Sequence, residues 1–203
     1  NGYIGMRLLP QLLDAGHEVI CAVRDPKRLS VTEDVMNKIK IITIDFSDIK
    51  EANVVPSDID AAYYLLHSMS STQGDFEELE DKCAVNFCSL IEKTKVKQVI
   101  YLSGIVNDQN LSKHLRSRKN VEQLLENASF NLTVLRAGII VGSGSASFEI
   151  IRDLCEKLPF MITPKWVKTK SQPIAIRTVM EFLMSVLLHP KCLNDAFDIG
   201  GPN

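Results

Sequence analysis

Two glycines three residues apart lie at the start of the sequence, in the run Asn1-Gly2-Tyr3-Ile4-Gly5, and a helix-like apolar pattern follows them. Gly2 would let the backbone approach a phosphate group, and Gly5 would let a helix pack closely against a strand. The exposed backbone N–H groups at the start of that helix would hold an anion. Tyr3 and Ile4 belong to the same turn. The spacing predicts a loop that binds the diphosphate of a dinucleotide.

A second candidate position lies about twenty residues further on, where the adenine ribose of a dinucleotide is recognised. Arg24 ends a strand-like run there, and Asp25 and Arg28 follow it. An acidic residue would bind the ribose 2′-hydroxyl of NAD, whereas an arginine suits the extra phosphate of NADP because its guanidinium binds phosphate at two points. Since Arg24 comes first, we expect NADP. Asp25 leaves NAD open, and a solvated charged turn is the alternative without a ligand.

Two more strand-like runs end in polar or exposed positions. Asp45 and Phe46 close one of them, so the carboxylate could accept a hydrogen bond from the adenine amino group while the backbone at Phe46 lines the base. A helix cap is the alternative for Asp45. Leu66 and His67 end the next run, where backbone contact with the cofactor is expected. His67 could be catalytic or an ordinary polar loop residue.

A serine and a His/Arg pair could carry proton chemistry. Ser103 ends an apolar strand, at a place where it can bind a substrate carbonyl or hydroxyl. His114 and Arg118 are four residues apart and share a helix face that continues into Val121 and Leu125. That face should look at the strand ends. The neighbouring cation disfavours a protonated imidazole, so a neutral His114 could give or take a proton. A polar first helical turn without chemistry is the alternative.

Composition limits the class of protein. The 203 residues are 45% hydrophobic and 24% charged, as in a globular protein, and the net charge of −2 argues against a nucleic-acid partner. No apolar run is long enough to span a bilayer. The five cysteines show no CxxC spacing, which predicts free thiols and a cytoplasmic location. The histidine spacing predicts no metal site.

Strand-like and helix-like runs alternate along the chain, which predicts an α/β fold with a doubly wound parallel sheet, the Rossmann fold. No strand precedes the glycines, so we expect the first strand to be missing and the chain to be a fragment of a longer one. We expect one domain over residues 1–203, with a nucleotide-binding core over 1–137 and a small irregular lobe on the substrate side over 138–203. The predicted strands are 18–24, 39–44, 59–66, 97–103, 131–136 and 196–199, and the predicted helices are 76–91, 112–127 and 176–188, besides the helix after Gly5.

Together these segments resemble the atypical short-chain dehydrogenases/reductases of the NmrA-like group and proteins named as nucleoside-diphosphate-sugar epimerases. The resemblance implies a Rossmann fold, a bound NAD(P), and cofactor contacts at Gly2, Gly5, Arg24 and Asp45. It also places Leu66 and Ser103 on the nicotinamide side, with Ala137 and Gly138 passing close to the ring. The matching segments are 1–5, 23–26, 45–46, 84–87, 99–104, 135–138 and 197–201.

The chain departs from that group in one respect. Active members use a Tyr-x-x-x-Lys pair, and the equivalent place here holds His114 and Arg118. His114 could replace the tyrosine as the acid, and Arg118 could hold the ribose. The first hypothesis is therefore an oxidoreductase or epimerase relative that acts on a carbonyl or hydroxyl of an unidentified small molecule. The second is a non-catalytic NADP(H)-binding redox sensor or assembly factor. The helix centred on Phe87 could pack on the sheet or pair with a second copy in a homodimer.

Overall fold

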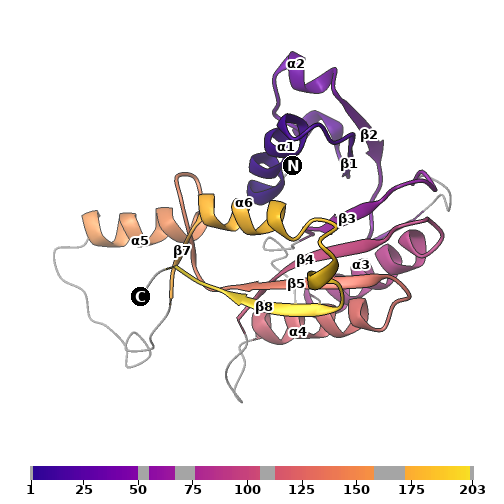
Figure 1. The fold of residues 1–203 in the computed structure, drawn as a ribbon. Coiled ribbons are helices and arrows are strands. Elements are labelled where there is room, and N and C mark those ends of the chain that lie inside the picture. Colours follow the sequence, from indigo (N-terminus) through magenta and orange to yellow (C-terminus); the bar gives the residue numbers. More distant parts are fainter. Residues whose placement is uncertain (1, 50–54, 67–75, 106–112, 158–171, 202–203) are drawn as a thin grey trace.

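The structure is a computed structural model that describes residues 2–49, 55–66, 76–105, 113–157 and 172–201. Helices and strands alternate through most of these ranges (Figure 1). The helices are α1 (Tyr3–Asp14), α2 (Glu33–Met36), α3 (Phe76–Ile91), α4 (Lys113–Glu126), α5 (Ala146–Lys157) and α6 (Ile176–Ser185), with short 3-10 turns η1 (Pro26–Arg28) and η3 (Pro190–Cys192). The strands are β1 (Val19–Val23), β2 (Ile39–Thr43), β3 (Ala61–Tyr64), β4 (Gln98–Gly104), β5 (Asn131–Ala137), β6 (Ile140–Val141), β7 (Ile174–Ala175) and β8 (Asp195–Ile199).

All strand pairs among the described residues are parallel. One sheet has the order β3-β4-β5-β8, while β1 pairs with β2, and β6 pairs with β7. Helices α1 and α6 lie on one side of the four-stranded sheet, and α3 and α4 lie on the other (Figure 1). The predicted doubly wound α/β architecture is confirmed. The predicted strands and helices correspond to β1, β2, β3, β4, β5, β8, α1, α3, α4 and α6, with ends that differ by a few residues.

The α3 side of the sheet has an aromatic core around Phe87. The Phe87 ring centroid lies 5.7 Å from that of Phe46, 4.9 Å from that of Tyr64 and 6.5 Å from that of Phe130. Each of the four side chains is at most 8% exposed. Because Phe87 points into this core, α3 packs on the sheet through it. A homodimer stays a prediction.

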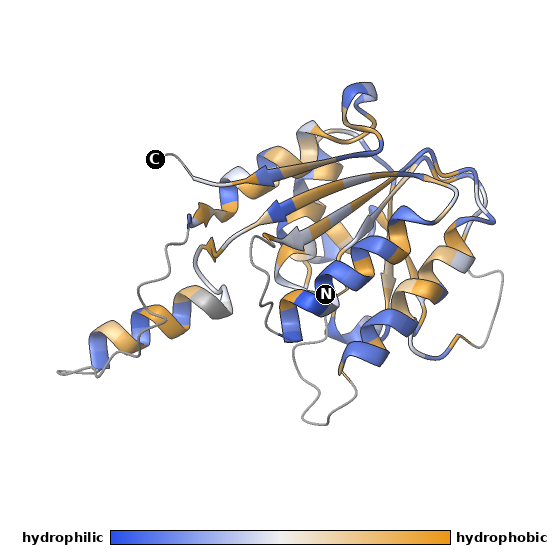
Figure 2. Ribbon diagram, turned by 90° about the horizontal axis from the view of Figure 1, so that it is seen from below, coloured by the Kyte–Doolittle hydropathy of each residue, from blue (hydrophilic) through white to orange (hydrophobic). Residues whose placement is uncertain are grey.

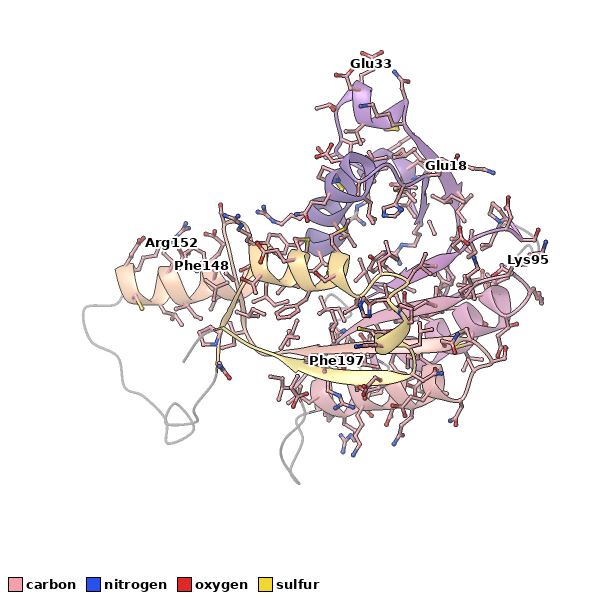
Figure 3. All side chains as sticks on the ribbon, in the orientation of Figure 1. Glu18, Glu33, Lys95, Phe148, Arg152 and Phe197 are labelled. Carbon is pink, nitrogen blue, oxygen red and sulfur yellow. The ribbon has the colours of Figure 1, made fainter. Side chains whose placement is uncertain are left out.

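The other side has an aliphatic core. Leu8 of α1 and Leu183 of α6 lie in one buried cluster with Ile100 of β4 and Leu135 of β5. Phe197 of β8 packs against its edge (Figure 3). Residues beyond 137 therefore supply a helix and an edge strand to the main core. The division into a nucleotide-binding core and a substrate-side lobe stays a prediction.

Helix α5 was not expected from the sequence. Ser145 caps it, because its Oγ accepts the N–H of Phe148 at 3.2 Å, while Glu149 accepts the N–H of Gly144 at 3.1 Å. The helix projects from the body, and Figure 2 shows orange apolar and blue polar residues around it. Ile150 and Leu154 are among its exposed apolar side chains.

Candidate functional site

The start of α1 has the features of an anion site. Gly2 precedes the helix in an extended conformation, no side chain caps the helix, and its first turn holds no acidic residue. A Cβ atom at Gly2 would meet nothing within 4 Å, so the approach is open. A Cβ atom at Gly5 would lie 3.8 Å from Leu65, directly after β3. The first turn of α1 therefore lies beside the carboxyl end of β3, and no side chain of the described residues caps its backbone N–H groups.

Tyr3 faces the connection between β6 and α5. The Arg7 guanidinium lies 4.6 Å from its ring centroid and donates to the carbonyl oxygen of Ser143 at 2.5 Å. The Tyr3 hydroxyl is buried and has no hydrogen-bond partner among the described residues. Ile4 is half-buried and packs against the aliphatic core. The side chains of Tyr3 and Ile4 thus anchor the turn, and the backbone carries its polar groups.

Arg24 and Asp25 follow β1 and have different surroundings. Arg24 is exposed and makes no hydrogen bond or ion pair with the described part of the chain. The Asp25 carboxylate accepts the backbone N–H of Lys27 at 3.0 Å and so caps the η1 turn. Of these two side chains, the guanidinium is the one whose hydrogen-bonding groups face solvent.

Asp45 and Phe46 follow β2. The Asp45 Oδ1 accepts both the backbone N–H of Ser47 at 2.9 Å and its hydroxyl at 2.6 Å, so the carboxylate stabilises a local turn, and residues 46–49 form no helix for it to cap. The Phe46 side chain is buried, and its carbonyl oxygen accepts the Asn86 side-chain amide at 2.7 Å. The expected contacts of Asp45 and Phe46 with adenine stay predictions.

Cys83 of α3 joins this group, and the sequence reasoning missed it. Burial raises the pKa of its thiol, the charges of Asp45 and Glu80 raise it further, and Arg24 lowers it. The thiol therefore lies within electrostatic reach of the residues expected at the adenine ribose. The only sequence signal was its position beside the segment 84–87, one turn from Phe87.

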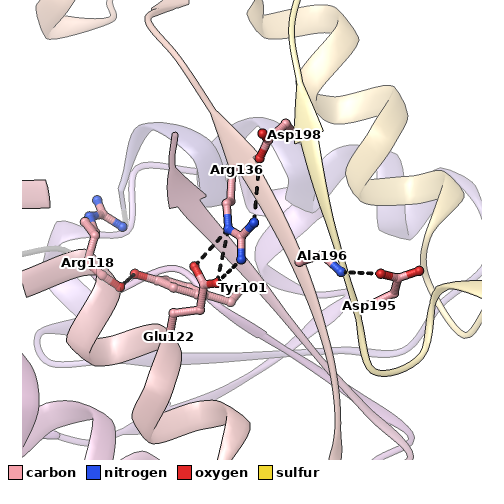
Figure 4. A network of polar contacts seen from close by, with 7 residues as sticks. All are labelled: Tyr101, Arg118, Glu122, Arg136, Asp195, Ala196 and Asp198. Carbon is pink, nitrogen blue, oxygen red and sulfur yellow. Dashed lines mark hydrogen bonds and ion pairs between the residues drawn. The ribbon is translucent and has the colours of Figure 1, made fainter. Parts of the chain in front are cut away.

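Ser103 and Arg118 meet at the carboxyl end of β4. Ser103 is 5% exposed and lies close enough to Tyr101 to lower the pKa of that phenol, but no described residue meets hydrogen-bond geometry with the Ser103 Oγ. The Arg118 guanidinium donates to the carbonyl oxygen of Leu102 at 3.2 Å, and the Tyr101 hydroxyl donates to the carbonyl oxygen of Arg118 at 3.3 Å (Figure 4). Burial raises the pKa of Tyr101, while the charge of Arg118 lowers it in part. The buried Ser103 hydroxyl thus follows directly on the residue whose carbonyl oxygen binds the Arg118 guanidinium.

His114 lies one helical turn before Arg118 and has other surroundings. It is exposed, and its ring centroid lies 6.0 Å from that of Phe76 on α3. The structure brings Ser103 and Arg118 to one strand end and places His114 against α3. Its expected role as an acid stays a prediction.

The remaining expected positions surround the strand ends. Leu66 is half-buried against the aromatic core, and His67 lies outside the described residues. Ala137 is buried in β5, between Gly104 and Ile199 on the flanking strands. A Cβ atom at Gly138 would lie 2.9 Å from the carbonyl oxygen of Gln172. The neighbouring backbone therefore requires a glycine at position 138, whatever binds nearby.

A charged network that the sequence reasoning missed holds α4 to the sheet. Glu122 of α4 is 6% exposed, and its Oε1 lies 3.1 Å from the Nε of Arg136 on β5 (Figure 4). Arg136 also lies 3.8 Å from Asp198 on β8. The hydrogen bond with Glu122 raises the pKa of Arg136. In the sheet register Arg136 lies between Ser103 on β4 and Asp198 on β8.

Two kinds of feature are absent from the described residues. No three His, Cys, Asp or Glu side chains in those ranges gather as a metal ion would need. No helix in the same ranges is long and apolar enough to cross a membrane.

Comparison with solved structures identifies proteins of the same fold. A UDP-glucuronic acid 4-epimerase from Bacillus cereus in complex with NAD superimposes with a TM-score of 0.78 at 16% identity, over 100% of this chain and 76% of that one. The terminal R domain from the myxalamid PKS-NRPS biosynthetic pathway gives 0.79 at 14% identity, over 100% of this chain and 64% of that one. A Bacillus halodurans protein described as an NAD-dependent epimerase/dehydratase gives 0.73 at 19% identity, over 99% and 91%. At sequence identities this low, the structural similarity shows that the chain shares the fold of these proteins and nothing about its activity.

Comparison with sequences identifies the family. No curated protein matches the chain. The profile of a family described as NAD(P)H-binding matches residues 1–158, which include the α1 turn, Arg24, Ser103 and Arg118. Because this match extends over well more than half of the sequence, the chain belongs to the NAD(P)H-binding family.

Proposed function

We propose that this chain binds NADP(H) in the manner of an atypical short-chain dehydrogenase/reductase and acts on a carbonyl or hydroxyl group of a small molecule. One observation carries the proposal: the Ser103 Oγ is buried at the end of β4, no described residue meets hydrogen-bond geometry with it, and the Arg118 guanidinium binds the carbonyl oxygen of the preceding residue, Leu102. A buried hydroxyl without a partner is costly, and a bound group that hydrogen-bonds to it removes that cost.

The residues present fit a dinucleotide. The open first turn of α1 would hold the diphosphate with its backbone N–H groups, and Arg24 would hold the ribose phosphate. Asp45 and Phe46 would border the adenine of the cofactor, and Leu66 and Ala137 would border its nicotinamide end. These assignments are supported by the positions of the residues at strand ends, where ligands bind in open α/β sheets.

The chemistry follows from Ser103 and Arg118. When bound, the nicotinamide supplies or accepts a hydride. The Ser103 hydroxyl would donate to the reacting oxygen and orient it. Arg118 would hold the ribose of the cofactor, and its charge would stabilise the negative charge that develops on that oxygen. His114 stays the candidate acid, because an imidazole can give or take a proton.

A second candidate function is a non-catalytic NADP(H)-binding sensor or assembly factor. The position of His114 favours it, since this exposed ring contacts Phe76 of α3. The two candidates differ in turnover: an oxidoreductase consumes NADPH with some carbonyl substrate and loses activity in His114→Ala. A sensor binds NADPH without turnover across a broad carbonyl panel.

The chain is further proposed to be cytoplasmic. The five cysteines, at positions 21, 83, 88, 155 and 192, form no disulfide, which suits a reducing compartment.

Titration with NADPH and NADH by fluorescence tests the cofactor assignment. We expect NADPH to bind more tightly and Arg24→Ala to weaken NADPH binding about tenfold or more while leaving NADH nearly unchanged, because a charged hydrogen bond to phosphate is lost. Lys40→Ala, which removes another exposed cation from β2, is the matched control and should have no effect. A preference for NADH, or a preference for NADPH that survives Arg24→Ala, would contradict the ribose assignment.

A further inference from the structure

We propose that Glu80 is a positioning residue: its buried hydrogen bond with Ser117 sets the rotation of α4 so that Arg118 reaches the carboxyl end of β4. This inference rests on the proposed function, because it concerns how Arg118 is presented to the cofactor. It assigns a role to a buried carboxylate on α3 that the chemistry above does not use.

The contact between Glu80 and Ser117 is buried on both sides. Glu80 is 5% exposed and Ser117 is fully buried, and the Ser117 hydroxyl donates to the Glu80 Oε2 at 2.5 Å. Removing a carboxylate from water is costly unless it accepts hydrogen bonds, so Glu80 holds the hydroxyl firmly. Hydrogen bonds weaken steeply when they bend, so this bond restrains the relative positions of the two helices. The pair therefore resists rotation of α4 relative to α3.

Rotation of α4 decides where Arg118 points. Consecutive residues of an α-helix project about 100° apart, so fixing Ser117 toward α3 directs Arg118 toward β4. There the Arg118 guanidinium donates to the Leu102 carbonyl oxygen at 3.2 Å. The Tyr101 hydroxyl, which donates to the Arg118 carbonyl oxygen at 3.3 Å, holds the same turn against the strand. A small rotation would move the guanidinium away from Ser103, at the next position of β4.

A neighbouring contact between the same helices provides a contrast. Arg116 lies 3.3 Å from Glu77, but the two side chains are 53% and 37% exposed. Exposed ion pairs are screened by solvent and hold geometry weakly. Of these two contacts, the buried Glu80–Ser117 bond is the one able to fix the rotation, and the exposed pair supplies a matched control.

A double-mutant cycle on NADPH affinity tests the inference, with Ser117→Ala, Arg118→Ala, both together, and Glu77→Gln as the control. We expect Ser117→Ala to weaken NADPH binding about fivefold, as loss of one positioning hydrogen bond would. In the Arg118→Ala background, Ser117→Ala should change affinity less than twofold, since nothing is left to position. Glu77→Gln should bind as the parent chain does. Thermal unfolding of each variant confirms that it is folded at the titration temperature.

The outcomes separate this inference from the proposed function. Unchanged affinity in Ser117→Ala, or full additivity with Arg118→Ala, overturns the positioning role, because a merely structural bond lowers stability without coupling to Arg118. If Arg118→Ala binds NADPH as the parent does, the assignment of Arg118 fails, and the inference fails with it. If the parent chain does not bind NADPH, the proposed function itself is wrong.

Discussion

The polar side chains at the carboxyl end of β4 differ in how much bonding capacity remains for a ligand. The Tyr101 hydroxyl donates its hydrogen bond to the Arg118 carbonyl oxygen. Arg118 has five N–H donors, and Leu102 accepts from one of its terminal nitrogens. The Ser103 hydroxyl has no partner among the described residues. Ser103 and Arg118 therefore have bonding capacity left for a bound group. The Tyr101 hydroxyl instead holds the backbone of α4 at Arg118.

Cys83 offers a residue-level test of the adenine side. Its thiol lies within reach of the Arg24 and Asp45 charges, and burial raises its pKa, so alkylation with iodoacetamide should be slow. Bound NADPH covering this region should slow it about fivefold or more, because access of the reagent falls by the fraction of sites occupied. Peptide mass spectrometry measures the rate at each cysteine. Cys155, which is exposed on α5, is the internal control.

Equal labelling of Cys83 with and without saturating NADPH would show that the cofactor does not cover this part of α3. A parallel decrease at Cys155 would instead indicate a change in the reagent or in the whole molecule.

At the scale of elements, two glycines meet different requirements. Gly2 lies at the open start of α1, where an added Cβ would touch nothing within 4 Å. Gly138 follows β5, where an added Cβ would lie 2.9 Å from the Gln172 carbonyl oxygen. The first glycine leaves room for a ligand, and the second lets two backbone segments pass closely.

Paired substitutions separate these requirements. Gly2→Ala should leave the free energy of unfolding within about 0.5 kcal/mol, since its φ of −84° suits alanine, but should weaken NADPH binding at least about tenfold by crowding the diphosphate. Gly138→Ala should cost about 1–3 kcal/mol of stability, because the backbone must shift to admit the methyl group. Urea unfolding and NADPH titration measure the two effects. Unchanged NADPH affinity in Gly2→Ala would exclude a diphosphate at the start of α1.

Most elements were predictable from sequence because their apolar periods follow directly from burial. Strand β4, buried from Gln98 to Ser103, reads as a continuous apolar run, and α3 shows a three- and four-residue repeat. The two-residue strands β6 and β7 are too short to show any period. Helix α5 carried a usable signal, the Ser145 cap with Glu149 four residues on, but it lies between segments rich in glycine and proline.

The positions of the candidate site residues were predictable at strand ends and less so on helices. The end of a parallel strand fixes where Ser103 lies, whereas a four-residue spacing only says that His114 and Arg118 share a face. Tertiary contacts decide the rotation of α4, and they bring Arg118 to Leu102 and His114 to Phe76. The sequence did not single out Cys83, because a cysteine on the apolar face of a helix cannot be distinguished by pattern from other core residues.

At the scale of the whole molecule, the two ends of the strands in the four-stranded sheet carry different polar groups. The carboxyl end carries Ser103 and Arg118, while the amino end holds a buried amide network around Gln98. The Gln98 side chain donates to the Thr133 hydroxyl at 2.7 Å and to the Val186 carbonyl oxygen at 2.9 Å, and accepts from the Leu188 N–H at 2.5 Å. This network fastens the connection between α6 and β8 to the start of β4 and β5.

The Gln98 network and the candidate site lie at opposite ends of the strands. A substitution in the network should therefore lower stability without changing NADPH affinity. Gln98→Leu would leave the Leu188 N–H and the Val186 carbonyl without their partner, at a cost of about 3 kcal/mol in the free energy of unfolding. NADPH affinity should stay within twofold, since the network touches none of the residues assigned to the cofactor. Lys97→Ala, which breaks an exposed ion pair with Asp60 beside it, should cost less than about 1 kcal/mol. Urea unfolding and NADPH titration of both variants measure this. A loss of affinity that parallels the loss of stability would mean that the amino end helps to set the geometry of the site.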